Sequence, residues 1–304
     1  MELEEPPSCG RDWSELQRDV LVLIFLKLGT MQVLTTAGSV CRTWRKVAKE
    51  EPELWRRIDI TNLAYDCDCY ALKDLTKLAI DRSGGRLEEF SVEKIGDDDL
   101  LRYLCDRTST LKKLCLISCY QLSEEAIVET GERQPLLEEI HITFAPFSET
   151  LTEIVGKQCP QLKSFKLNTS WHGKGTTYLS DEEEDNDDAL GIAKNMHQLH
   201  HLQLIGNRLT NEGLKAILDG CPYLETLDIR HCYNVNMDPD MRPRCAKLKT
   251  IRLPNDSLDD VDNISDDYEE TYSDYPFVDN ISDDYEETYS DYPFVDDDED
   301  GFEF

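Results

Sequence analysis

Short-spaced cysteines and histidines are the first residues in this sequence whose chemistry could matter, because such groups can bind a metal. The candidates are the pairs Cys67 with Cys69 and Cys115 with Cys119, and the cluster His197, His200 and His201. The cysteines lack the paired C-x-x-C spacing of structural zinc sites, and no acidic helical motif accompanies the histidines. A surface cluster is therefore favoured over a metal site, and no metal ligand is predicted.

A phosphate loop and a thiol nucleophile are the other two chemical possibilities. Gly173-Lys174-Gly175-Thr176 contains fragments of a phosphate-binding loop but lacks the spaced glycine that precedes them. Cys41 lies on an apolar helical face, where burial would raise the thiol pKa and suppress the reactive thiolate. The sequence therefore predicts a protein that is not an enzyme and needs no cofactor.

The negative charge of the chain is concentrated in two segments. The formal net charge is −31, but seven acids lie in 181–188 and 21 in 256–304, neither of which contains Lys or Arg. The remaining 35 acids nearly balance the 32 basic residues, so the rest of the chain is almost neutral. Acidic segments repel phosphate backbones and anionic lipids, which argues against nucleic acid or membrane partners.

The cellular compartment is predicted from the first residues and from the cysteines. Met1 to Gly10 are acidic, with no basic-then-apolar signal, and the longest apolar run, Val20 to Leu26, has seven residues where a membrane span needs about 20. The eleven cysteines are odd in number and several recur periodically. We therefore expect reduced, mostly buried thiols in a protein of the nucleus, the cytoplasm or both.

The elements that would position functional residues begin with a helical segment. Apolar residues recur at helical spacing up to Gly29, at Leu16, Val20, Leu21, Ile24, Phe25 and Leu28. A second pattern comprises Leu34, Ala37, Cys41, Trp44 and Ala48, which Gly38 is expected to divide into two helices and Pro52 to close. About forty residues rarely bury enough apolar surface to fold alone, so this module needs a partner surface.

A repeated strand motif follows. The pattern L-x-x-L-x-L occurs seven times, at start-to-start spacings of 24, 26, 25, 37, 25 and 24 residues, and the longest spacing contains the acidic insertion. Its first positions are Leu87, Leu111, Leu137, Leu162, Leu199, Leu224 and Leu248. This periodicity predicts an α/β leucine-rich-repeat solenoid, with parallel strands on the concave face and helices such as 209–217 on the convex face.

Residues between the inward-pointing leucines should line the concave surface, because side chains alternate along a strand. The candidates for contact with a target protein are Lys113, His141, Lys166, His201, Asp228, Arg230 and Arg252. Their charges are mixed, so they do not indicate the chemistry of the target.

The acidic segments are expected to be disordered because they cannot offset the entropy lost on ordering. They are a loop at 180–188 and a tail at 256–304, in which residues 261–277 repeat without change at 278–294. Residues 1–10 are also expected to be disordered. The remaining divisions are a helical module at 11–60 and the repeats at 61–255.

The N-terminal module resembles the F-box. The resemblance rests on Leu16 to Leu21 with Ile24, Phe25 and Leu28, on Val40 to Arg45, and on Pro52 to Trp55 with Ile58 to Ile60. One departure is Gln17, where the family usually has proline after the first leucine. The whole of 11 to about 255 is similar to the short plant F-box/LRR proteins, which have cysteine-containing repeats.

The resemblance implies a function. Proteins of this family dock on a Skp-type adaptor, and through it on a cullin, as substrate receptors of an E3 ubiquitin ligase. The residues implied for adaptor contact are Leu16, Val20, Ile24, Leu28, Val40, Cys41 and Trp44. An alternative is an acidic leucine-rich-repeat nuclear protein that binds basic partners such as histones. It explains the tail but leaves the helical module without a role.

Overall fold

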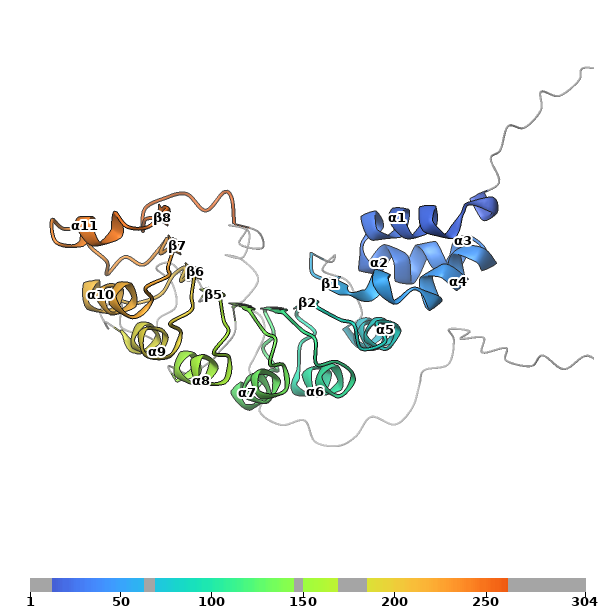
Figure 1. The fold of residues 1–304 in the computed structure, drawn as a ribbon, viewed down its shortest axis with the longest axis horizontal. Coiled ribbons are helices and arrows are strands. Elements are labelled where there is room, and N and C mark those ends of the chain that lie inside the picture. The colour runs from blue at the N-terminus through green and yellow to red at the C-terminus, as the bar shows by residue number, and fades with distance from the viewer. Residues whose placement is uncertain (1–12, 63–68, 145–149, 169–184, 262–304) are drawn as a thin grey trace, which may run out of the picture. The chain divides into compact units, whose positions relative to one another are not determined.

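A computed structural model describes residues 13–62, 69–144, 150–168 and 185–261 of the 304-residue chain. Helices of the N-terminal module come first, and a single parallel sheet follows with helices along one side (Figure 1). Residues 1–10, which were expected to be disordered, lie outside these ranges. The same holds for the segment 173–176, Cys67 and most of the acidic tail. The predicted fold class, an F-box module followed by a leucine-rich-repeat solenoid, is confirmed.

The N-terminal module contains the helical segments that the apolar spacing predicted. Its elements are η1 (Trp13–Glu15), α1 (Arg18–Leu28), α2 (Thr30–Gln32), the π-helical η2 (Val33–Ala37), α3 (Gly38–Val40), α4 (Arg42–Glu50) and η3 (Pro52–Trp55). Gly29 ends α1 with a φ of +85°, a conformation that glycine adopts without steric cost. The expected end of the first helix is thus observed.

The division of the second helical pattern lies at Cys41 and not at Gly38 as predicted. Gly38 has φ −63° and continues the helical run, whereas Cys41 is extended at φ −160°. The Cys41 thiol accepts a hydrogen bond from the Trp44 backbone N–H at 3.5 Å and so caps α4. A helix can begin wherever a side chain satisfies its free N–H groups, and a thiol does so here in place of the usual hydroxyl or carboxylate.

Within the described residues, eight parallel strands form the sheet, in the order of the chain. They are β1 (Arg57–Ile60), β2 (Glu89–Glu93), β3 (Lys113–Ile117), β4 (Glu139–Thr143), β5 (Ser164–Asn168), β6 (His201–Gln203), β7 (Thr226–Asp228) and β8 (Thr250–Arg252). Equivalent positions of the repeat are paired, as in Phe90 with Leu114 and Leu227 with Ile251. The predicted register is therefore confirmed from β2 to β8.

The first strand, β1, lies within the predicted helical module at 11–60 and pairs with the first repeat. Residues 57–60 were assigned to the helical module, but Ile58 pairs with Phe90 and Ile60 with Val92 in the sheet. The alternating Ile58 and Ile60 are buried against the first repeat, which explains why this short segment is a strand.

Helices cover the other side of the sheet (Figure 1). They are α5 (Cys69–Arg82), α6 (Asp98–Arg107), α7 (Glu124–Arg133), α8 (Leu151–Gln158), α9 (Asp187–Asn195), α10 (Asn211–Gly220) and α11 (Met241–Cys245). Side chains of Asp97, Ser123 and Thr210 accept backbone N–H groups at three of their N-termini. Among the described residues, no helix combines the length and apolar character needed to cross a membrane.

Two residues of the predicted disordered loop at 180–188 are helical, and its residues 180–184 lie outside the described ranges. Asp187 and Asp188 form the first turn of α9, and Asp188 accepts a hydrogen bond from Asn207 Nδ2 at 2.9 Å. Acidic side chains are favourable at a helix N-terminus, where the helix dipole is positive. The last residues of the acidic run therefore form the beginning of helix α9.

The core is one continuous cluster of described residues from the helical module and from strands β1 to β7, with Ile251 of β8 packed against it. Six of the nine described cysteines are buried and all nine are free, as expected for structural thiols. Burial raises the pKa of the Cys119, Cys221 and Cys232 thiols to about 12. These sulfur atoms pack the repeats and remain protonated at neutral pH.

Candidate functional site

The first candidate site is the outer face of α1. Leu21 and Phe25 point into the core, with 0% and 1% exposure, while Val20, Leu23 and Leu26 remain 40%, 63% and 51% exposed. At 100° per residue Leu23 lies opposite the buried pair. Eight of the eleven α1 residues are apolar, a composition typical of a helix covered on all sides.

The seven residues that the resemblance implied for adaptor contact differ in accessibility. Val20, Leu28 and Val40 are exposed, and Leu16, Ile24, Cys41 and Trp44 are half-buried. Trp44 packs inside the module, with its ring 5.4 Å from Phe25 and its indole N–H donated to the Trp13 carbonyl at 2.9 Å. Cys41 caps α4 as described.

Sequence reasoning missed Leu23 and Leu26, the two most exposed leucines of α1. They were not selected because the apolar stripe was assigned to the residues that recur at three- and four-residue spacing. That stripe includes Leu21 and Phe25, which belong to the core. Apolar residues occur around most of α1. A helical-wheel projection would therefore have identified Leu23 on the face opposite the buried residues.

The second candidate site is an open hollow of about 850 Å³ on the concave side of the sheet. The seven predicted concave residues all line it: Lys113, His141, Lys166, His201, Asp228, Arg230 and Arg252. Alternation along the strands thus places these side chains on one surface. Their role in binding a target stays a prediction.

His141, which lines the hollow, is held neutral. Burial lowers its pKa to about 3, and the charges of Lys166 and Lys113 act in the same direction. Its Nε2 atom has no hydrogen-bond partner, and the nearest carboxylate oxygen, of Glu139, is 3.8 Å away. His141 therefore offers a neutral imidazole to the hollow and no positive charge.

Arg230 lines the hollow but is not freely exposed, because its side chain is only 4% accessible. It donates to both oxygens of Asp228, from Nε at 3.0 Å and from Nη2 at 2.6 Å. These hydrogen bonds are the main cause of its raised pKa. Arg230 therefore lies on the concave surface as alternation predicts, but its donors are occupied by neighbouring groups, which alternation does not predict. Its role in target contact stays a prediction.

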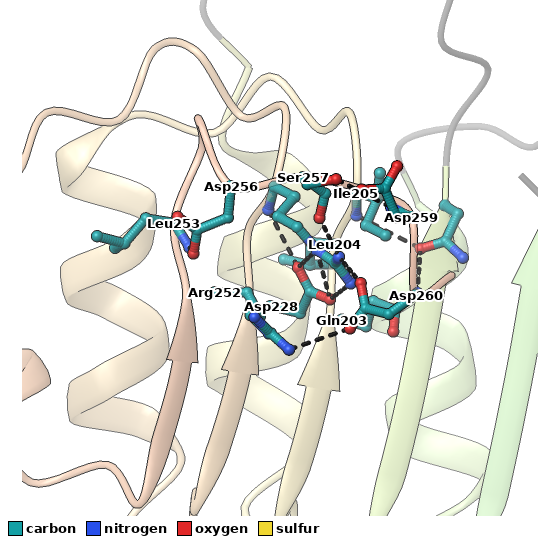
Figure 2. Close-up of polar contacts among 12 residues, drawn as sticks. Gln203, Leu204, Ile205, Asp228, Arg252, Leu253, Asp256, Ser257, Asp259 and Asp260 are labelled. Atoms are coloured by element: carbon teal, nitrogen blue, oxygen red, sulfur yellow. Dashed lines mark hydrogen bonds and ion pairs between the residues drawn. The ribbon is translucent and has the colours of Figure 1, made fainter. Parts of the chain in front are cut away.

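The contacts that cover Arg230 come from the beginning of the predicted disordered tail. Arg230 Nη1 donates to the Ser257 carbonyl at 2.6 Å and to the Asp260 carboxylate. Figure 2 shows Asp260 reaching to the end of Arg252, whose Nη2 lies 3.1 Å from it. Residues 256–261 therefore belong to the folded repeats, and the predicted boundary at 256 is too early.

The histidine cluster is spread over the repeat surface. His197 and His201 contact the Gly220 carbonyl and the Thr226 hydroxyl at 2.8 Å, and His200 stacks on Tyr223 with ring centres 6.0 Å apart. Within the described ranges, no group of three His, Cys, Asp or Glu side chains is arranged to hold a metal ion.

Comparisons with known proteins agree with the two-part architecture. The F-box-like family model matches residues 13–61. Three relatives from Arabidopsis thaliana are F-box protein SKIP19 (40% identity, 86% of this chain and 83% of the relative), F-box/LRR-repeat protein 22 (41%, 86% and 81%) and F-box/LRR-repeat protein 23 (40%, 82% and 55%). The chain thus spans about half of the last relative and about four fifths of the others.

The helical module, the repeat sheet and these similarities together define an F-box protein with leucine-rich repeats. This chain belongs to the F-box/LRR-repeat proteins.

Proposed function

We propose that this chain is the substrate-recognition subunit of a Skp–cullin–F-box E3 ubiquitin ligase. The outer face of α1 and the exposed Val40 dock on a Skp-type adaptor, which connects the chain to a cullin. The concave hollow binds the target protein. The complex acts in the nucleus, the cytoplasm or both.

The observation that carries the proposal is the exposed apolar face of α1. Val20, Leu23 and Leu26 remain exposed on α1, whereas Leu21 and Phe25 of the same helix are buried in the core. Burying one such leucine in an interface contributes about 1.5–3 kcal/mol. A partner that covers this face would therefore be bound through hydrophobic contact, as the resemblance to the F-box implies.

The mechanism is proximity and involves no bond chemistry on this chain. A target held on the solenoid would be kept near a ubiquitin-loaded enzyme elsewhere in the complex, which raises its effective concentration. The buried, protonated thiols of Cys119, Cys221 and Cys232 are unsuited to carry ubiquitin as a thioester.

The first prediction concerns Leu23. Leu23→Asp should weaken binding to a Skp-type adaptor by about 30-fold, because it removes about 2 kcal/mol of apolar burial and adds a charge to the interface. Affinity is measured by surface-immobilised adaptor titration with the full-length chain. Leu190→Asp, at 50% exposure on the convex helix α9, is the matched control and should bind like wild type. Equal binding by the two variants would contradict docking through α1.

The alternative, an acidic nuclear protein that binds histones, gives the apolar face of α1 no role. Co-purification separates the two functions. Recovery of adaptor together with cullin supports the ligase, whereas recovery of basic chromatin proteins without adaptor supports the alternative.

A further inference from the structure

The segment after β8 returns across the concave side of the sheet. The Leu253 N–H donates to the Asp256 carboxylate at 2.8 Å, which fixes a turn immediately after the strand. The chain then reaches the ends of β7 and β8, where Ser257 and Asp260 contact Arg230. Asp260 and Val261 thereby become part of the lining of the hollow.

Arg230 makes this contact specific. A charged side chain with 4% exposure needs partners for its donors, since an unpaired buried charge is strongly unfavourable. Asp228 accepts from Nε and Nη2, and Nη1 is left to point toward the returning segment. There it meets a backbone carbonyl, of Ser257, and a carboxylate three residues later, of Asp260.

The charge of this end of the hollow is positive without Asp260. Arg230 and Arg252 lie at this end, against the single carboxylate of Asp228. Asp260 is 53% exposed, in contrast to the arginine it contacts, so its carboxylate lies at the solvent boundary. Its hydrogen bond with Arg230 lowers its pKa, which keeps it ionised in this position. Because the Asp260 carboxylate is accessible to solvent, a carboxylate from another molecule can displace it from Arg230.

We propose that this end of the concave hollow is a binding site for an acidic segment of another polypeptide, and that Asp260 occupies its carboxylate position in the free chain. The identification of that polypeptide as the target rests on the proposed function. The site itself does not, since it is formed by this chain alone.

An acidic polypeptide fits these contacts better than a small anion does. Arg230 Nη1 binds a main-chain carbonyl as well as a carboxylate, and the two acceptors are separated by three residues of one chain. A peptide can supply both groups at this spacing, whereas an isolated anion replaces the carboxylate alone. Arg252, which donates to Asp260 from the edge strand β8, adds a second charge-assisted hydrogen bond.

The test uses the full-length chain and a fluorescent peptide with the sequence of residues 255–262. Fluorescence anisotropy measures its binding to wild type, to Asp260→Ala and to the double variant Asp260→Ala with Arg252→Glu. We expect Asp260→Ala to bind about tenfold more tightly than wild type, because the competing carboxylate is gone. The double variant should lose at least that gain. A control peptide with Asn at positions 259 and 260 should bind none of the three.

Equal binding by wild type and Asp260→Ala, no effect of Arg252→Glu, or equal binding of the control peptide would each overturn the proposal. Arg252→Gln repeats the test without a new negative charge, should the first double variant not fold. Adaptor binding is measured on the same proteins and should not change among them. If the wild type did not bind the adaptor, the proposed function would be contradicted, but the peptide result would remain valid.

Discussion

Arg230 and His141 line the same hollow, yet burial has opposite consequences for their charges. The hydrogen bonds that Arg230 donates to Asp228 and Asp260 raise its pKa against the cost of desolvation. His141 has only Glu139 at 3.8 Å, with Lys113 and Lys166 also nearby, so burial and positive charge lower its pKa. Carboxylate partners therefore stabilise the buried charge of Arg230, whereas burial close to two lysines keeps His141 neutral at neutral pH.

The neutral state of His141 predicts a pH dependence of stability. Unfolded histidine accepts a proton below about pH 6.5, whereas folded His141 does so only near pH 3. The unfolded state binds more protons between these values, so stability is lost as the pH falls through this window. Between pH 7.5 and pH 5.5, the free energy of unfolding of the wild type should fall by about 1 kcal/mol more than that of His141→Gln. Urea unfolding at the two pH values measures both changes. Parallel losses in the two proteins would show that His141 is protonated normally when folded.

At the scale of elements, the periodicity of hydrophobic residues predicted the features of the fold that depend on burial alone. The L-x-x-L-x-L pattern identified seven strands and their register, because a shift by one residue would expose each buried leucine. It did not identify β1, since Ile58 and Ile60 were read within the helical motif. It also could not place the beginning of α4, which depends on the Cys41 thiol, or the ordered residues 256–261, which depend on the distant Arg230.

Gln17, the departure from the usual F-box sequence, allows a test at the beginning of α1. Its φ of −62° and ψ of 144° are compatible with proline, and its side chain makes no capping hydrogen bond. Gln17→Pro should therefore stabilise the chain by about 0.4–1 kcal/mol, because it restricts the unfolded state without altering the folded one. Thermal unfolding measures the change. Asp19→Pro, inside the first turn, provides a comparison that should gain less, and a loss of stability for Gln17→Pro would refute the argument.

At the scale of the whole described unit, the F-box module and the repeats share a core, and Trp55 lies at their junction. It is fully buried, donates its indole N–H to the Ala48 carbonyl of α4 at 3.0 Å, and has the Arg82 guanidinium of α5 5.3 Å from its ring centre. Thr30 of α2 also accepts the Asp59 N–H of β1 at 3.0 Å. The module thus covers the first repeat, which would otherwise expose its apolar end.

Trp55→Ala should consequently destabilise both parts together. Removing a buried tryptophan costs about 3–5 kcal/mol, and here the cavity would border α4, β1 and α5 at once. Hydrogen exchange followed by mass spectrometry should show faster exchange in peptides covering 42–50, 57–60 and 72–82. Leu227→Ala, which removes a buried leucine of β7, should accelerate exchange in the last repeats and leave 42–50 unchanged. If Trp55→Ala affected 42–50 alone, the module would be a separate folding unit that does not hold the solenoid in a fixed position.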